Sequence, residues 1–283
     1  MKIGAIIQAR MSSTRLPGKV LKELPYGSGI SVIEQIAKRL KHSQKIKQVI
    51  VATSNEQDDE RIVNLCESKN IDVYAGDLNN VLDRFYNAAK QFSLDLILRV
   101  TGDCPAVDHA IIDELIENHI DGRYDFSTLS AIKRTFPKGI DASVFSFELL
   151  KEACNSAVHD YEKEHVTSYF YKSHPDKFSI LSLEAPFHYK FPELRLTLDT
   201  HEDYIFFCAL YDSLYETNPH FSLDDILKLI NNKPWIIKIN ESVVQKKIYE
   251  NLTEEITELI EYSRKQDLKR VLPELEKLIE YDP

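Results

Sequence analysis

Residues 2–20 read KIGAIIQARMSSTRLPGKV and predict a buried strand followed by a basic loop. Residues 3–7 form an apolar run without turn residues, which is typical of a strand buried on both faces. The loop after them carries Arg10, Arg15 and Lys19 among three hydroxyl side chains. Ligands of open α/β sheets bind at the carboxyl ends of strands, where hydroxyl and N–H groups hold phosphate oxygens and cations neutralise their charge. The segment therefore predicts a polyphosphate site, with a solvated basic loop as the alternative.

Composition limits the classes of protein and partner. Of the 283 residues, 43% are hydrophobic and 28% are charged, which is typical of one large α/β domain with or without an appendage. The formal net charge of −10 argues against nucleic acid and anionic membrane as partners. No apolar run approaches the roughly 20 residues that cross a bilayer, and a core strand follows Met1 and Lys2 directly, so we expect no signal peptide. The four cysteines lack C-x-x-C spacing, so we expect reduced thiols in a cytoplasmic protein.

Strand-like and helix-like segments alternate through the first 120 residues. Further strands are predicted at 48–53, 71–74 and 94–100, and helices at 31–41, 58–69, 81–92 and 108–119. This alternation is typical of βαβ units and of a mainly parallel sheet. Right-handed crossovers would place the loops after Ile7, Ala52 and Val100 along one edge of that sheet.

The second half is less regular. It predicts strands at 124–129, 140–145, 178–183 and 194–198, and helices at 147–156, 162–171, 200–215 and 223–231. From residue 241 apolar residues recur at helical spacing among many Glu and Lys residues, and Pro273 separates a last short helix. We therefore expect a main domain of residues 1–240 and a helical extension of residues 241–283. The extension either packs on the main domain or makes the protein a homodimer.

Asp103 and Asp199 are the acids best placed for chemistry. Asp103 follows the strand at 94–100 directly after Gly102, and Asp199 stands where the strand at 194–198 gives way to a helix. Mg²⁺ is commonly held by one or two carboxylates together with substrate phosphate oxygens. Each aspartate alone could be a helix cap. Two acids at two strand ends favour a shared Mg²⁺, because a cap would explain only one of them.

Other site motifs are absent from the sequence. Neither the Walker pattern nor G-x-G-x-x-G follows the first strand, and no G-x-S-x-G elbow occurs. His159 and His165 lack the H-E-x-x-H spacing, which argues against zinc. These absences disfavour P-loop, dinucleotide-binding, α/β-hydrolase and zinc-protease chemistry.

Seven motifs resemble those of a known family, in the same order along residues 1–238. They are QARxxSxRLPGK at 8–19, VATS at 51–54, VLDRF at 81–85, TGDCP at 101–105, GID at 139–141, EHVT at 164–167 and RLTLDTxED at 195–203. The family is the cytidylyltransferases that activate acidic sugars, which include the CMP-sialic acid and CMP-Kdo synthetases. Within it, the chain is similar to the spore-coat polysaccharide biosynthesis (SpsF) type. The resemblance implies a Rossmann-like nucleotide-diphospho-sugar transferase (GT-A-like) sandwich over residues 1–240.

The resemblance also implies a reaction and a set of residues. CMP would pass from CTP to an acidic sugar of the nonulosonic or keto-deoxy type, with release of pyrophosphate, for surface polysaccharide biosynthesis. The catalytic residues would be Arg15, Lys19 and Asp103, and Asp103 and Asp199 would ligate Mg²⁺. The nucleotide would contact Gln8, Ala9, Arg10, Ser13, Arg15, Lys19, Thr53, Ser54, Thr101 and Gly102. Thr197 and His201 stand where better-known members carry a second acid, which leaves a second metal open.

The acceptor is the part that the sequence leaves open. An acidic acceptor needs a cation, and the candidates are Arg134, Lys138 and Arg99, while the resemblance adds Asp141 and His165. One alternative keeps the fold and transfers the nucleotide to a phosphonate or a polyol phosphate. The other is a non-catalytic nucleotide-binding or assembly subunit, against which the intact cationic and acidic residues argue.

Overall fold

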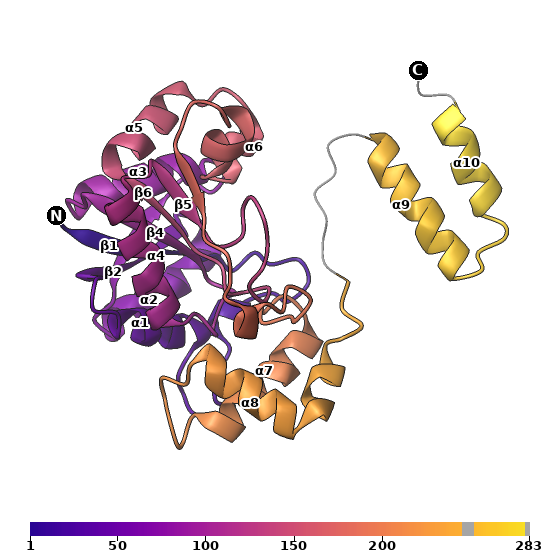
Figure 1. Cartoon of the computed structure of the whole chain (residues 1–283), viewed down its shortest axis with the longest axis horizontal. Coiled ribbons are helices and arrows are strands. Elements are labelled where there is room, and N and C mark those ends of the chain that lie inside the picture. The colour runs from indigo at the N-terminus through magenta and orange to yellow at the C-terminus, as the bar shows by residue number, and fades with distance from the viewer. Residues whose placement is uncertain (245–251, 281–283) are drawn as a thin grey trace. The chain divides into compact units, whose positions relative to one another are not determined.

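A computed structural model describes residues 1–244 and 252–280 and divides the chain into two compact units, Met1–Ser242 and Val243–Pro283 (Figure 1). Residues 245–251 and 281–283, which belong to the predicted helical extension, lie outside the described residues. The larger unit holds all of the predicted site residues.

The larger unit is built on a seven-stranded sheet with the order β3-β2-β1-β4-β6-β5-β7. The strands are β1 (Ile3–Gln8), β2 (Gln48–Ser54), β3 (Asp72–Gly76), β4 (Leu96–Thr101), β5 (Phe126–Thr128), β6 (Ser143–Ser146) and β7 (Ile180–Ser182). β1 pairs in parallel with both β2 and β4, whereas β6 runs antiparallel to β4 and β5. The prediction of a mainly parallel sheet is therefore confirmed.

Helices cover both faces of the sheet, and each face has its own hydrophobic core. In β1, Ala5 and Ile7 point into one core and Ile6 into the other, as the two-residue period of a strand requires. The first core receives α1 (Val32–Lys41), α2 (Glu60–Ser68), α4 (His109–Gly122), α7 (His201–Leu214) and α8 (Leu223–Asn232). The second receives α3 (Val81–Gln91) and α5 (Phe147–Ser156), and α3 also contacts α6 (Asp160–Glu164) (Figure 1).

Capping boxes fix the starts of α1 and α7. Ser31 and Glu34 form the box of α1, since the Ser31 hydroxyl accepts from the Glu34 N–H and the Glu34 carboxylate accepts from the Ser31 N–H. Thr200 and Asp203 form another at the start of α7. These caps satisfy N–H groups that a helix leaves without intrahelical partners.

Two predicted elements differ. The prediction of a strand at 194–198 is wrong, because in the described chain this segment makes only a single bridge, between Arg195 and Lys138. The N–H of Leu196 donates to the Lys138 carbonyl, and the N–H of Leu198 donates to the Asp103 carbonyl. The segment is extended because it links two loops instead of joining the sheet. The helix at 162–171 is divided, because α6 ends at Glu164 and a separate π-helical turn spans Tyr169–Ser173.

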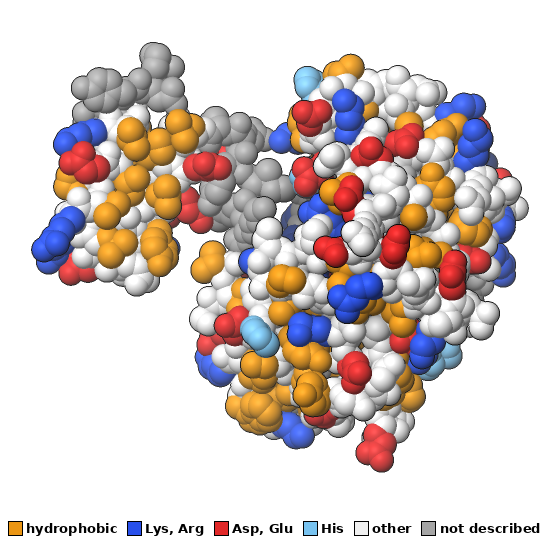
Figure 2. Space-filling view, turned by 180° about the vertical axis from the view of Figure 1, so that it is seen from behind, with side chains coloured by type: hydrophobic (Ala, Val, Ile, Leu, Met, Phe, Trp, Pro, Cys, Tyr) orange, Lys and Arg blue, Asp and Glu red, His pale blue; other side chains and the backbone are white. Residues whose placement is uncertain are grey.

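The smaller unit is a hairpin of α9 (Leu252–Lys265) and α10 (Leu272–Glu280), with Pro273 in the first turn of α10. Ile256 and Ile260 of α9 are buried. Figure 2 shows apolar side chains on the surface of this hairpin. The exposed ones are Leu252, Leu259, Tyr262, Leu268, Val271 and Leu278. Across the part of the chain that the structure describes, helices long and apolar enough to cross a membrane are absent.

Candidate active site

The loops after β1, β2 and β4 meet at one edge of the sheet, as the crossover argument predicts. The N–H of Gly102 donates to the Gln8 carbonyl at 2.8 Å, and the N–H of Ala9 donates to the Ala52 carbonyl at 3.1 Å. A Cβ atom on Gly102 would lie 3.0 Å from the Gln8 carbonyl oxygen. Glycine at 102 therefore lets the β4 loop lie directly against the β1 loop.

The basic loop is fixed at its base by hydrogen bonds within the loop and to the residues that follow β2. Gly18 adopts a left-handed conformation (φ 66°), and its N–H donates to the Met11 carbonyl at 3.0 Å, which folds the loop back on itself. The Met11 N–H donates to Asp59 Oδ1 at 2.7 Å, and Asp59 Oδ2 accepts from both the N–H and the hydroxyl of Ser54. Arg10 and Arg15 are exposed, while Asp59 is buried. The end of β2 thus anchors the loop.

Lys19 joins the two predicted metal ligands. Its Nζ lies 3.2 Å from Asp103 Oδ2 and 2.9 Å from Asp199 Oδ1. Arg15 contributes a second cation, 3.1 Å from Asp199 Oδ2. Burial alone would lower the pKa of Lys19, but Asp103 and Asp199 raise it above its ordinary value. Burial would likewise raise the pKa of Asp103, but Lys19 and the Thr101 hydroxyl lower it, so the pair is charged at neutral pH.

A buried arginine holds Asp199 from the other side. Arg195 donates from Nη2 to Asp199 Oδ2 at 3.1 Å and is itself held by Asp203, through Nε and Nη2 at 2.8 Å each. Asp203 is fully buried and also accepts from the N–H groups of Asp199 and Thr200 and from the Asn240 amide. The T-x-x-D pattern at 200–203 indicates a helix cap at Asp203, whereas the salt bridge of Asp203 with Arg195 depends on the folded path of residues 195–199.

The candidate acceptor cations have different surroundings. Arg134 is paired with Asp141 at 2.8 Å, and the Gly139 N–H also donates to Asp141. Arg99 donates from Nη2 to the Gln8 side chain at 2.9 Å, and its Nε is buried without a hydrogen-bond partner in the described chain. Burial lowers the pKa of Arg99, with Asp103 as the first opposing charge. Arg99 is therefore the less compensated cation.

The remaining predicted residues have different environments. The Thr53 hydroxyl is buried without a hydrogen-bond partner in the described residues, and Ser54 is committed to Asp59. Lys138 reaches the Arg195 segment through its backbone. His165 is half-buried at the end of α6. The structure thus brings Lys19, Asp103, Asp199 and Arg15 into direct contact. In the described chain, the ion pairs that form this cluster do not include Thr53, Ser54, Lys138 or His165.

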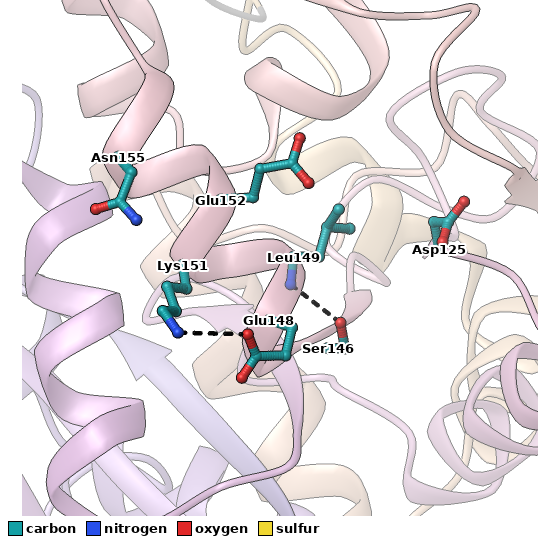
Figure 3. Close-up of a pocket in the computed structure, with 7 residues that line it drawn as sticks. All are labelled: Asp125, Ser146, Glu148, Leu149, Lys151, Glu152 and Asn155. Atoms are coloured by element: carbon teal, nitrogen blue, oxygen red, sulfur yellow. Dashed lines mark hydrogen bonds and ion pairs between the residues drawn. The ribbon is translucent and has the colours of Figure 1, made fainter.

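A separate cavity of about 450 Å³ lies elsewhere (Figure 3). Ser146, at its rim, pairs with Leu96 at the start of β4, so the cavity is at the sheet edge opposite to Thr101. Asp125, Glu148 and Glu152 line it, and Lys151 lies 3.5 Å from Glu148. An acidic lining whose lysine is already paired does not suit a polyphosphate.

Among the described residues, no group of three or more His, Cys, Asp or Glu side chains is arranged to hold a metal ion. The pair of Asp103 and Asp199 nevertheless shares one cation, because the Lys19 ammonium lies within 3.2 Å of an oxygen of each. Two carboxylates that need further oxygens from phosphate match the usual protein contribution to a Mg²⁺ site.

Comparison with known proteins identifies the family of this chain. The profile of the family described as cytidylyltransferase matches residues 4–266, which extends past the predicted end of the resemblance at 238 and includes α9. The spore coat polysaccharide biosynthesis protein SpsF of Bacillus subtilis is 35% identical over 81% of this chain and 94% of its own length. A 3-deoxy-manno-octulosonate cytidylyltransferase of Geobacter metallireducens is 30% identical over 52% of this chain and 61% of its own length.

A solved structure shows the same fold. It is a cytidylyltransferase from Leptospira borgpetersenii, 32% identical, with a TM-score of 0.77 over 88% of this chain and 100% of that one. The predicted nucleotide-diphospho-sugar transferase fold is therefore confirmed. The chain belongs to the cytidylyltransferase family and is an enzyme of that class.

Proposed function

We propose that this enzyme transfers CMP from CTP to an acidic sugar and releases pyrophosphate. The observation that carries the proposal is the joining of Arg15 and Lys19, from the basic loop, to Asp103 and Asp199 at the carboxyl edge of the sheet. The names of the relatives support the acceptor class, since one acts in polysaccharide biosynthesis and another is a 3-deoxy-manno-octulosonate cytidylyltransferase.

In this proposal the basic loop binds the triphosphate. Arg15 and Lys19 neutralise the phosphate oxygens and the departing pyrophosphate, with Arg10 and Ser13 as further contacts of the loop. Gln8, Ala9, Thr53 and Ser54 lie at the ends of β1 and β2, near the ribose and base. Such preorganised cations favour the transition state because charge builds up on the phosphate oxygens during transfer.

Mg²⁺ fits the acids present and is part of the proposal. Asp103 and Asp199 would hold it, and it would supply charge stabilisation to the reacting phosphates. Arg195 would keep the Asp199 carboxylate in place, because Asp203 fixes the guanidinium from behind. Thr197 and His201 flank Asp199 without adding a carboxylate, so this proposal uses one metal ion.

Arg99 is the residue we assign to the anionic group of the acceptor. Its side chain lies on the same face of the sheet as Gln8, and within the described chain no carboxylate lies within 4.0 Å of its guanidinium. A guanidinium without an ion-pair partner can bind a carboxylate in a bidentate way. Arg134, by contrast, would have to leave Asp141.

Steady-state kinetics of Arg99→Met and Arg134→Met test the acceptor site, with 3-deoxy-manno-octulosonate as the first acceptor. Loss of a hydrogen-bonded charge pair costs about 1.5–3 kcal/mol, so Arg99→Met should raise the KM for the acceptor roughly tenfold or more and weaken CTP binding less, through the lost hydrogen bond to Gln8. Arg134→Met should have the smaller effect. An unchanged acceptor KM in Arg99→Met would refute the assignment. Activity only with phosphonates or polyol phosphates would refute the sugar acid.

A further inference from the structure

Among the described residues, the cluster around Asp199 is balanced in charge by side chains alone. Three cations face three carboxylates in this part of the described chain, and the ion pairs that join them are 3.2 Å or shorter. The cations are Arg15, Lys19 and Arg195, and the carboxylates are those of Asp103, Asp199 and Asp203. All except Arg15 and Asp103 have side chains that are at most 14% exposed. A further charge that enters the cluster alone would therefore be uncompensated.

Lys19 is the cation that Asp103 and Asp199 share. Its Nζ bridges Asp103 Oδ2 and Asp199 Oδ1, and its side chain is only 12% exposed. A divalent cation bound by both acids would repel the ammonium and take over its acceptors. Lys19 can leave only if another anion accepts it.

We propose that Lys19 is an internal counter-cation that keeps divalent metal out of the Asp103–Asp199 pair until CTP binds. The inference rests on the proposed function and adds a binding linkage to it. The triphosphate would accept Lys19 and Arg15, and this would free the two acids for the metal. The metal would in turn offset the repulsion between phosphates and acids, so each ligand strengthens the binding of the other by the same factor.

Arg195 explains why the site would keep its shape during the exchange. Arg195 donates from Nε and Nη2 to Asp203 at 2.8 Å each, and these two hydrogen bonds would hold the guanidinium in place when Lys19 and Arg15 move. Among the described residues, Lys19 has no such second anchor; its charged contacts there are the two acids themselves. The exchange is therefore assigned to the loop cations and not to Arg195.

Binding of Mn²⁺, measured by electron paramagnetic resonance, tests the proposal without turnover. The wild-type enzyme should bind Mn²⁺ weakly alone and at least about tenfold more tightly with CTP present and no acceptor. Lys19→Met should bind Mn²⁺ alone about tenfold more tightly than wild type while binding CTP more weakly. Lys22→Met is the matched control, because Lys22 lies against the Tyr204 ring, and it should behave as wild type.

A thermal melt of each variant provides a second reading that does not depend on CTP. Mn²⁺ alone should raise the melting temperature of Lys19→Gln, which keeps a polar group beside the acids, more than that of wild type. Equal Mn²⁺ affinity in wild type and both Lys19 variants, together with tight Mn²⁺ binding in the presence of CTP, would overturn the Lys19 inference alone. Absence of Mn²⁺ binding in every variant, with and without CTP, would overturn the metal proposal as well.

Discussion

Replacement of Asp203 by asparagine is the sharpest test of how the site is held. Asp203 Oδ1 accepts from Arg195 Nε at 2.8 Å and from Asn240 at 3.0 Å, and Oδ2 accepts from Arg195 Nη2 and the N–H groups of Asp199 and Thr200. An amide nitrogen at either position would face at least two donors. The substitution also leaves Arg195 without its buried counter-charge.

The expected cost follows from these contacts. Removal of one partner from a buried ion pair costs about 3–5 kcal/mol. For a unit of this size, 1 kcal/mol lowers the melting temperature by about 2–4 °C, so Asp203→Asn should melt roughly 10 °C below wild type. Urea denaturation gives the loss in the free energy of unfolding directly. Arg195, released from Asp203, would shift toward Asp199, so turnover should fall as well.

Asp225→Asn is the matched control for this test. Asp225 occupies the same position in the capping box of α8 and accepts from Ser222, but no ion pair within 4.0 Å joins it to an arginine in the described chain. Loss of cap contacts alone costs about 1 kcal/mol. If Asp203→Asn and Asp225→Asn lose the same free energy of unfolding, the Arg195–Asp203 pair does not hold the site.

Three further perturbations test separate parts of the account. Asp103→Asn should lower pyrophosphate release about a hundredfold or more with little change in melting temperature, and near-full activity would contradict the metal assignment. Burial lowers the pKa of His119 from 6.5 to about 4, so the stability it contributes is complete above pH 6.5 and is lost as pH falls toward 4. Between pH 7 and pH 5, the free energy of unfolding measured by urea denaturation should fall by about 2 kcal/mol less in His119→Leu than in wild type. An equal fall in both proteins would refute this. Gly139 has φ +96°, and an added Cβ would lie 1.9 Å from the Leu196 carbonyl oxygen. Gly139→Ala should therefore lower the melting temperature far more than Gly27→Ala, because a Cβ on Gly27 meets nothing within 4 Å. Equal decreases in melting temperature would show that the close approach at Gly139 is unimportant.

Much of the fold could be predicted because its signals are local. The apolar run of β1, the Ser31–Glu34 capping box and the strand–helix alternation each depend on residues close in sequence. Parallel pairing then places the loops after β1, β2 and β4 at one edge. The contact of Lys19 with Asp103 follows from that rule, although 84 residues separate them.

The parts that the sequence did not predict depend on long-range pairing. Residues 194–198 alternate like a strand, yet their hydrogen bonds go to the loops at Lys138 and Asp103. Asp59 looks like a helix-start acid, and only the folded chain shows that it accepts from Met11, 48 residues away. Side-chain type alone could not separate Arg99 from Arg134, because the distinction is the presence of Asp141 beside one of them.

Pyrophosphate release with a panel of nucleotides and acceptors tests the proposed transfer of CMP to a sugar acid most directly. The panel would pair CTP, UTP and ATP, each with Mg²⁺, with keto-deoxy sugar acids, their neutral counterparts, phosphonates and polyol phosphates. We expect rapid release only with CTP and a sugar acid. A preference for UTP or ATP, or release with a neutral sugar at the same rate, would contradict it.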